Sequence, residues 1–316
     1  MSAKPSFGTR LGWRIEALLW DVVMGIFALL PIEKASALGG WALRTLGPYL
    51  PAHRTAMINA KLVFPDLDDA GARRLAMAAW GNLGRLGGEF PHMDKMRPYE
   101  ADGRVEIRGL AHLQIIKKSG KPAVIITGHF ANWEVMAAAI CQSGIEARVS
   151  YRHANNPHID ARISAIRHGY GVPHLSAKGE GGAREMLLAL QDGQSVTFMN
   201  DQKFNRGIDA PFFGHALKTA PGPARLARRF DVPLLPISIT RLPKARFIVT
   251  FHPPIMPDQN PDKTVAIANT VARINSFLED QIRAHPEDWF WVHRRWPKHV
   301  YRKDETSRDS AASGLT

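Results

Sequence analysis

The spacing of hydrophobic positions changes near residue 100. Before that point, residues 33–98 carry apolar side chains at helical spacing, as in the Ala-rich stretch 73–90. From about residue 104, short apolar runs alternate with segments of helical spacing. The predicted strands are 105–109, 122–128, 147–151, 194–200, 232–240 and 246–252, and the predicted helices are 110–118, 132–144, 157–169, 181–193, 222–230 and 262–284. This alternation predicts an α/β fold with a mainly parallel sheet flanked by helices. We expect strand 246–252 to be antiparallel, at the sheet edge.

Residues 1–32 are predicted to form a membrane-associated helix that lies in, or dips into, the bilayer interface. The uncharged stretch 22–32 is shorter than the roughly 20 apolar residues that a simple spanning helix needs, and Glu16 and Asp21 interrupt the longer window. Side chains that suit an interface accompany it: Trp13 and Trp20 at the headgroup level, and Lys4, Arg10 and Arg14 on the cytoplasmic side. The alternative is an ordinary amphipathic helix of the fold.

The remainder of the chain is predicted to be one domain, because neither a repeat nor a clear linker interrupts it. This domain covers 33–303 and has a helical N-terminal part, 33–98. The small and polar residues of 304–316 predict a disordered tail.

Charge sets this chain apart from an average globular protein. It has 41 Lys and Arg against 29 Asp and Glu, a formal net charge of +12. Such a field attracts polyanions, among which nucleic acid, anionic lipid and an acidic carrier protein all qualify. The one cysteine, Cys141, excludes an internal disulfide and indicates a reducing compartment.

The candidate chemistry lies at His129, which directly follows the predicted strand 122–128. In open parallel sheets, ligands bind outside the carboxyl ends of the strands. Asn132 can cap the next helix, and Glu134 in its first turn can hydrogen-bond the imidazole. A neutral imidazole can take a proton from an alcohol, and a carboxylate on its other nitrogen stabilises the resulting imidazolium.

The spacing of His129 and Glu134 alone is weak evidence, because a structural capping network would give the same pattern. No nucleophilic Ser or Cys is adjacent to them in sequence. The chemistry that fits is therefore direct attack of a substrate hydroxyl on a thioester, without an acyl-enzyme.

Several segments, taken in order, resemble one protein family. The segment GHFANWE at 128–134 resembles the signature of the late lipid A acyltransferases, which share a His-x4-Asp/Glu motif with glycerolipid acyltransferases. Further similar segments are SYR at 150–152, FMNDQ at 198–202, PFFGHALKTAPGPARLARR at 211–229 and EDWFWVHRRW at 287–296. Two segments depart from the family pattern: ANWE, where many members have MNWE or MNWD, and KFNRGID after Asp201. The resemblance therefore predicts the reaction class. It leaves open the length of the transferred acyl chain and the identity of the acceptor substrate.

This resemblance implies an O-acyltransferase at the cytoplasmic side of the cell inner membrane. It implies that His129 is the general base and Glu134 its support. The donor would be an acyl carrier protein thioester, or coenzyme A, and the acceptor an anionic lipid A precursor. Residues expected to bind substrate are Asn132, Arg152, Asp201, Lys218 and Arg225. No cofactor is expected.

Two other site types are less well supported by the sequence. Basic residues interleaved with aromatics near the C-terminus are also typical of nucleic-acid binders, but no nucleic-acid module is recognisable, so we expect no nucleic-acid partner. The histidines of 153–174 fit no zinc spacing, so we expect no metal. Two alternative functions stay open: a related acyltransferase with another lipid or glycolipid acceptor, and a basic membrane-peripheral binding protein in which His129 and Glu134 are only structural.

Overall fold

A computed structural model of the chain describes residues 6–177 and 180–302. The tail predicted over 304–316 lies outside the described residues. The predicted fold class is confirmed: a mainly parallel sheet is flanked by helices, and a helical N-terminal region precedes it.

The sheet has seven strands in the order β1-β9-β8-β2-β5-β3-β4. Within the described part of the chain, β8 and β9 form its one antiparallel pair, and the other neighbours are parallel. Its strands are β1 (Val105–Arg108), β2 (Val124–Thr127), β3 (Ala147–Tyr151), β4 (Leu175–Ala177), β5 (Ser195–Met199), β8 (Leu234–Leu242) and β9 (Arg246–Phe251). All four residues of β2 are buried, as its position inside a covered sheet requires.

The edge of the sheet differs from the prediction. Strand β9 is antiparallel, as expected, but β1 pairs on its outer side, so β9 is interior. The hydrophobic pattern also did not indicate the short strand β4, or a hairpin formed by β6 (Ile208–Phe212) and β7 (His215–Thr219). These strands are short, and their apolar runs are too brief to be distinguished from loop.

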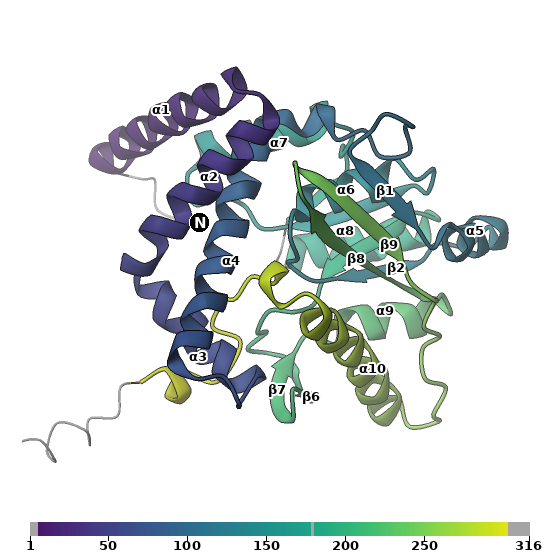
Figure 1. The fold of residues 1–316 in the computed structure, drawn as a ribbon. Helices are drawn as coiled ribbons and strands as arrows, with labels where there is room; N and C mark the ends of the chain where they lie inside the picture. Colours follow the sequence, from purple (N-terminus) through teal and green to yellow (C-terminus); the bar gives the residue numbers. More distant parts are fainter. Residues whose placement is uncertain (1–5, 178–179, 303–316) are drawn as a thin grey trace, which may run out of the picture.

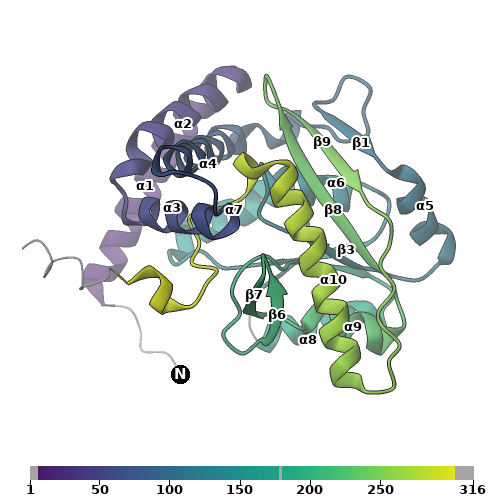
Figure 2. The ribbon, with the colours of Figure 1, turned by 60° about the horizontal axis from the view of Figure 1, so that its bottom comes forward.

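Helices cover both faces of the sheet and form a separate group at one side of it. The helices interleaved with the strands are α5 (Leu110–Ser119), α6 (Trp133–Cys141), α7 (Pro157–Gly169), α8 (Glu180–Gln191), α9 (Gly222–Phe230) and α10 (Lys263–Ala284). The group at the side comprises α1 (Phe7–Leu29), α2 (Ile32–Leu46), α3 (Pro51–Val63) and α4 (Asp69–Glu89). Figures 1 and 2 both show this group beside the sheet rather than on one of its faces.

Helix α1 lies on the outside of the molecule (Figure 1). Of its 23 residues only Ala17 is buried. Its exposed large apolar side chains are Phe7, Leu11, Ile15, Leu18, Leu19, Val22, Val23, Ile26 and Leu29. None of the helices in 6–177 and 180–302 combines the length and the apolar character that crossing a membrane would require.

Helices α2 and α4 approach each other through glycine. A Cβ placed on Gly84 would overlap the carbonyl oxygen of Gly39, and one on Gly88 would overlap that of Ala35. Small residues at such a contact let two helix backbones come together closely. A methyl group there would push the helices apart. Elsewhere in α4, Gly87 has open space around the position of a Cβ.

We therefore predict that Gly84→Ala lowers the free energy of unfolding by about 1–3 kcal/mol, the usual cost of overpacking. The matched control is Gly87→Ala, which should raise that free energy by up to about 1 kcal/mol, because alanine is the better helix former. Urea unfolding of the wild type and both variants measures these changes in the free energy of unfolding. Equal stability of the two would contradict the close contact between α2 and α4.

Candidate active site

Two neighbouring parallel strands bring the candidate residues together. In the pairing of β2 with β5, Thr127 stands opposite Met199. His129 and Asp201 each follow their strand by two residues, so both side chains come to the same carboxyl edge of the sheet. This is the edge at which open α/β sheets bind ligands.

His129 and Asp201 form a hydrogen-bonded pair. The imidazole Nδ1 donates to Asp201 Oδ1 over 2.8 Å, and the backbone N–H of His129 donates to Asp201 Oδ2 over 3.0 Å. The Nδ1 proton therefore fixes the tautomer in which Nε2 is the proton acceptor. Nε2 lies 3.4 Å from the amide nitrogen of Gln202, and the imidazole side chain is 14% exposed.

The Asp201 carboxylate is buried, yet it stays ionised. Burial alone would raise its pKa, but attraction to His129 and the hydrogen bonds from His129 and Trp289 hold the pKa well below its usual range. The Trp289 indole N–H donates to Oδ2 over 2.9 Å. Both carboxylate oxygens are thus occupied, and the charge is fixed beside the imidazole.

Glu134 occupies a different position from the one predicted. It accepts two hydrogen bonds from the Arg167 guanidinium, at 2.9 and 2.6 Å, and a third at 2.5 Å from Tyr170. Burial and the adjacent carboxylate raise the pKa of Tyr170, which keeps its hydroxyl a donor. Within the described residues, no hydrogen bond joins Glu134 to His129. The prediction that Glu134 orients the imidazole is therefore corrected, since Asp201 holds that place and Glu134 ties α6 to α7.

A cavity of about 330 Å³ opens beside His129. Polar, aromatic and apolar side chains all contribute to its lining. The lining comprises His129, Trp133, Glu134, Ala137, Val149, Ser150, Tyr151, Arg152, Arg167, Val172, Leu175, Met199, Gln202, Phe290 and His293. A narrower recess shares five of these residues and continues between α6 and the sheet, where Met136, Ile140 and Thr197 line it.

The other predicted substrate-binding residues are divided between this cavity and other places. Arg152 lines the cavity. Neither Lys218 nor Arg225 lines it. Lys218 is exposed on β7 and paired with Asp209, and Arg225 is exposed on α9. Asn132 is fully buried, and its side chain accepts from the backbone of α6 and donates to Glu89. Its amide is thus occupied by protein, which does not support the prediction that it binds substrate.

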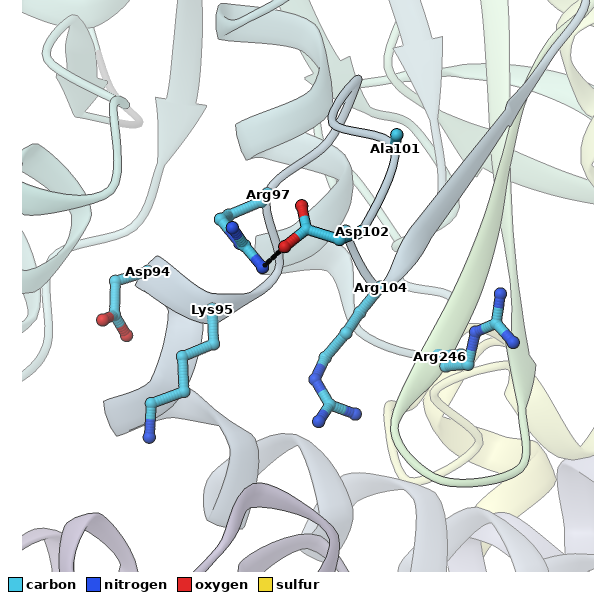
Figure 3. A pocket seen from close by; sticks show the side chains of 8 residues that line it. Asp94, Lys95, Arg97, Ala101, Asp102, Arg104 and Arg246 are labelled. Carbon is cyan, nitrogen blue, oxygen red and sulfur yellow. Dashed lines mark hydrogen bonds and ion pairs between the residues drawn. The ribbon is translucent and has the colours of Figure 1, made fainter.

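A second cavity, of about 630 Å³, lies between the 3-10 helix η2 (Phe90–Lys95) and the start of β9 (Figure 3). Two of the three arginines that line it form ion pairs within the protein. Arg97 pairs with Asp102, as the dashed line in Figure 3 shows, and Arg104 pairs with Glu33. Among the residues that the structure describes, no histidine lines this space, so the candidate chemistry stays with the cavity at His129.

Some site residues were missed from the sequence. Arg167 and Tyr170 had no local signal, because both reach the site from a segment remote from His129 in the chain. Phe290 lies in the segment 287–296 that resembles the family, but no role was predicted for it. The pairing of His129 with Asp201 did have a signal in the sequence, because each residue follows a buried strand by two positions. Recognising it requires knowing that β2 and β5 are neighbours, which the sequence pattern does not reveal.

A model of the family described as bacterial lipid A biosynthesis acyltransferase matches residues 5–298. The chain belongs to this family. The predicted family and the predicted enzyme class, an acyltransferase, are thereby confirmed, and the alternative of a noncatalytic binding protein falls away. Membership also implies an acyl donor and a lipid acceptor.

The acyltransferase resembles enzymes with different named acceptors. It is 25% identical to the lipid A biosynthesis lauroyltransferase of Escherichia coli, over 94% of this chain and 96% of that protein. It is 20% identical to a lipid A biosynthesis acyltransferase of Haemophilus influenzae, over 92% of each chain. It is also 23% identical to the phosphatidylinositol mannoside acyltransferase of Mycolicibacterium smegmatis, over 92% of this chain and 90% of that protein. Similarity at this level shows the family and not the acceptor.

The geometry predicts that Glu134→Ala destabilises the acyltransferase. It would leave the Arg167 guanidinium, which is 17% exposed, without a carboxylate, and removing one partner of a buried pair costs about 3–5 kcal/mol. The matched control is Glu106→Ala, which breaks an exposed pair with Arg108 and should cost about 1 kcal/mol or less. Chemical denaturation of both variants provides the comparison. If the two variants were equally stable, the tie between α6 and α7 through Glu134 would be excluded.

Proposed function

We propose that this acyltransferase transfers a fatty acyl chain from an acyl carrier protein thioester, or from coenzyme A, to a hydroxyl of a lipid A precursor. The reaction takes place at the cytoplasmic side of the cell inner membrane. The observation that carries the proposal is the His129–Asp201 pair, whose histidine lines a cavity in a chain of this family.

His129 acts as the general base. Its Nε2 takes the proton as the acceptor oxygen attacks the thioester carbonyl carbon, and Asp201 stabilises the imidazolium that forms. When the tetrahedral intermediate collapses, the C–S bond breaks and the imidazolium returns its proton to the leaving thiolate. The products are an ester and a free thiol, and the base is restored.

Direct transfer fits the surroundings of His129. Among the described residues, no hydroxyl or thiol hydrogen-bonds its Nε2. Cys141 does not line the cavity, and burial raises its pKa to about 12, which keeps it a thiol at neutral pH. The cavity of about 330 Å³ beside His129 includes apolar lining residues such as Val149, Val172 and Leu175, as an acyl chain requires. The donor chain enters this cavity.

The charge of the site region favours an anionic substrate. Arg152 is exposed and lines the cavity, and the whole chain carries a net charge of +12. Lipid A precursors carry phosphates and carboxylates, and acyl carrier protein is acidic. Guanidinium groups bind such anions through paired N–H donors. The second candidate acceptor is a phosphatidylinositol mannoside, because a relative with that named activity matches over nearly the whole chain.

A transfer assay tests the mechanism. The protein is reconstituted in vesicles with labelled acyl carrier protein thioester and either a Kdo-bearing lipid A precursor or a phosphatidylinositol mannoside. We expect transfer to the lipid A precursor, and we expect His129→Ala to abolish it. Asp201→Asn should lower kcat by about 10³–10⁴-fold, because an orienting amide favours the wrong tautomer.

The matched control is His153→Ala. His153 also pairs with an aspartate, Asp160, at 2.7 Å, but His153 is exposed and does not line the cavity. This variant should keep wild-type transfer. Full activity of His129→Ala would overturn the assignment of the base, and transfer to the mannoside alone would replace the proposed acceptor by the second candidate.

The protein binds the membrane through α1 lying in the bilayer interface. The helix exposes a row of large apolar side chains, and Arg10 and Arg14 lie exposed near its start. An amphipathic helix of this kind buries its apolar face at the boundary of headgroups and acyl chains, and basic residues add attraction to anionic lipid. On its inner side α1 is held to α7 by an ion pair between Asp21 and Arg162.

Vesicle flotation tests this docking. The double substitution Leu18→Glu with Ile26→Glu should abolish binding to vesicles that contain anionic phospholipid, because it places two charges in the apolar face. The control, Ile115→Glu, changes an apolar residue of similar exposure on α5, which lies far from α1 in Figure 1, and should bind like the wild type. Undiminished binding of the double variant would refute docking through α1.

A further inference from the structure

A buried polar cluster lies behind the loop that carries His129, and the proposed mechanism uses none of its members. The cluster consists of Asn82 and Glu89 from α4, Arg241 from β8 and Asp288 near the C-terminus. Glu89 is completely buried, at 0% exposure. A buried carboxylate is expensive to keep unless it is fully bonded, so its partners indicate what it does.

Three side chains donate hydrogen bonds to Glu89. Its Oε1 accepts from the Ser36 hydroxyl over 2.7 Å, and the Arg241 guanidinium donates to both carboxylate oxygens and forms an ion pair with them. Its Oε2 also accepts from the Asn132 amide over 2.8 Å. Asn132 belongs to the loop that begins at His129.

The side-chain oxygen of Asn132 is also committed. This Oδ1 accepts from the backbone N–H groups of Glu134 and Val135 and so caps α6. The amide nitrogen of Asn132 is therefore bonded to Glu89, and its amide oxygen is bonded to the first turn of α6. Asn132 thus links Glu89 to the start of α6 and to the loop before it.

The same cluster contacts the loop at a second point, the backbone of Ala131. Arg241 donates to Asn82, and Asn82 donates to the Asp288 carboxylate over 2.5 Å. The carbonyl oxygen of Asp288 accepts from the backbone N–H of Ala131 over 2.7 Å. Ala131 has a φ of 40°, a left-handed conformation that an alanine adopts only when its surroundings impose it.

We propose that Glu89 is a positioning residue for His129. Through Asn132 it holds the loop His129–Asn132 in the conformation that places the imidazole against Asp201, and Arg241 keeps its charge compensated. The helical N-terminal region thereby takes part in catalysis. This inference rests on the proposed role of His129 as the base.

An exchange of the two side chains tests the proposal. Asn132→Asp breaks the hydrogen bond between them, because two carboxylates then face each other. Glu89→Gln weakens it, because the one remaining carbonyl oxygen must serve the donors of Asn132, Ser36 and Arg241. In the Asn132→Asp variant the new side chain would still cap α6, since aspartate and asparagine are about equal as N-caps. The double variant restores one amide and one carboxylate, with their positions exchanged, and keeps the net charge of the cluster.

In the transfer assay, each single variant should lower kcat by about 10–100-fold with KM unchanged, the effect of a misplacement of about 1 Å. The double variant should recover at least about tenfold over the worse single variant, as expected for directly coupled residues. Ser36→Ala is the matched control: it removes another hydrogen bond to the same carboxylate without touching the loop, and should keep wild-type kcat.

A spectroscopic readout separates this proposal from the proposed function. The hydrogen-bonded Nδ1 proton of His129 should give a low-field proton resonance in the wild type, weaken in both single variants and return in the double variant. If the wild type transfers no acyl chain, the proposed function fails and this comparison still tests the positioning.

Where Asn132→Asp prevents folding, Asn132→Ser replaces it. Serine caps α6 but is too short to reach Glu89, so it should lower kcat and weaken the resonance in a folded protein. Wild-type kcat and an unchanged resonance in Glu89→Gln would overturn the proposal. So would a folded double variant that is no better than the worse single variant.

Discussion

The burial of one carboxylate, that of Asp201, is the constraint on which the site depends. An ionised group without water needs a partner for each of its oxygens. Asp201 finds them in His129 and in Trp289, two residues that lie 160 positions apart by their numbers. The end of β2, the end of β5 and the C-terminal segment must therefore meet at one point. The contacts that satisfy this charge also fix the orientation of the imidazole that we propose as the base.

The sequence predicted those features that are encoded locally. The alternation of apolar runs indicated the sheet and its helices, and the position of His129 after a buried strand indicated the edge of the sheet at which the candidate site lies. Asn132 was recognised as a cap, which it is. The partner of His129 was not, because Glu134 is close in sequence whereas Asp201 is close only across the sheet. Strand order decides such neighbours, and a pattern of hydrophobic positions carries no information on it.

In the helical N-terminal region too, the hydrophobic pattern does not reveal which residues become neighbours in the folded protein. Its helices were predicted from their periodicity, but the periodic pattern does not distinguish a carboxylate that faces water from one that is buried. Glu89 stands in an Ala-rich helix, near glycines that allow α2 and α4 to touch. Only the assembled structure shows that the close approach of these helices sets the place of Glu89. The region that carries the apolar surface of α1 is thus also in contact with the loop of the base.

The contribution of Trp289 has a consequence for the biogenesis of the protein. Synthesis is vectorial, and N-terminal segments fold first. Helix α1 leaves the ribosome long before the segment that donates the indole N–H to Asp201 and closes over the loop at Phe290. The N-terminal helices of a growing chain can thus fold before Asp201 has gained its indole donor. The contacts that fix the orientation of the His129 imidazole can therefore be complete only after residues 289 and 290 have left the ribosome.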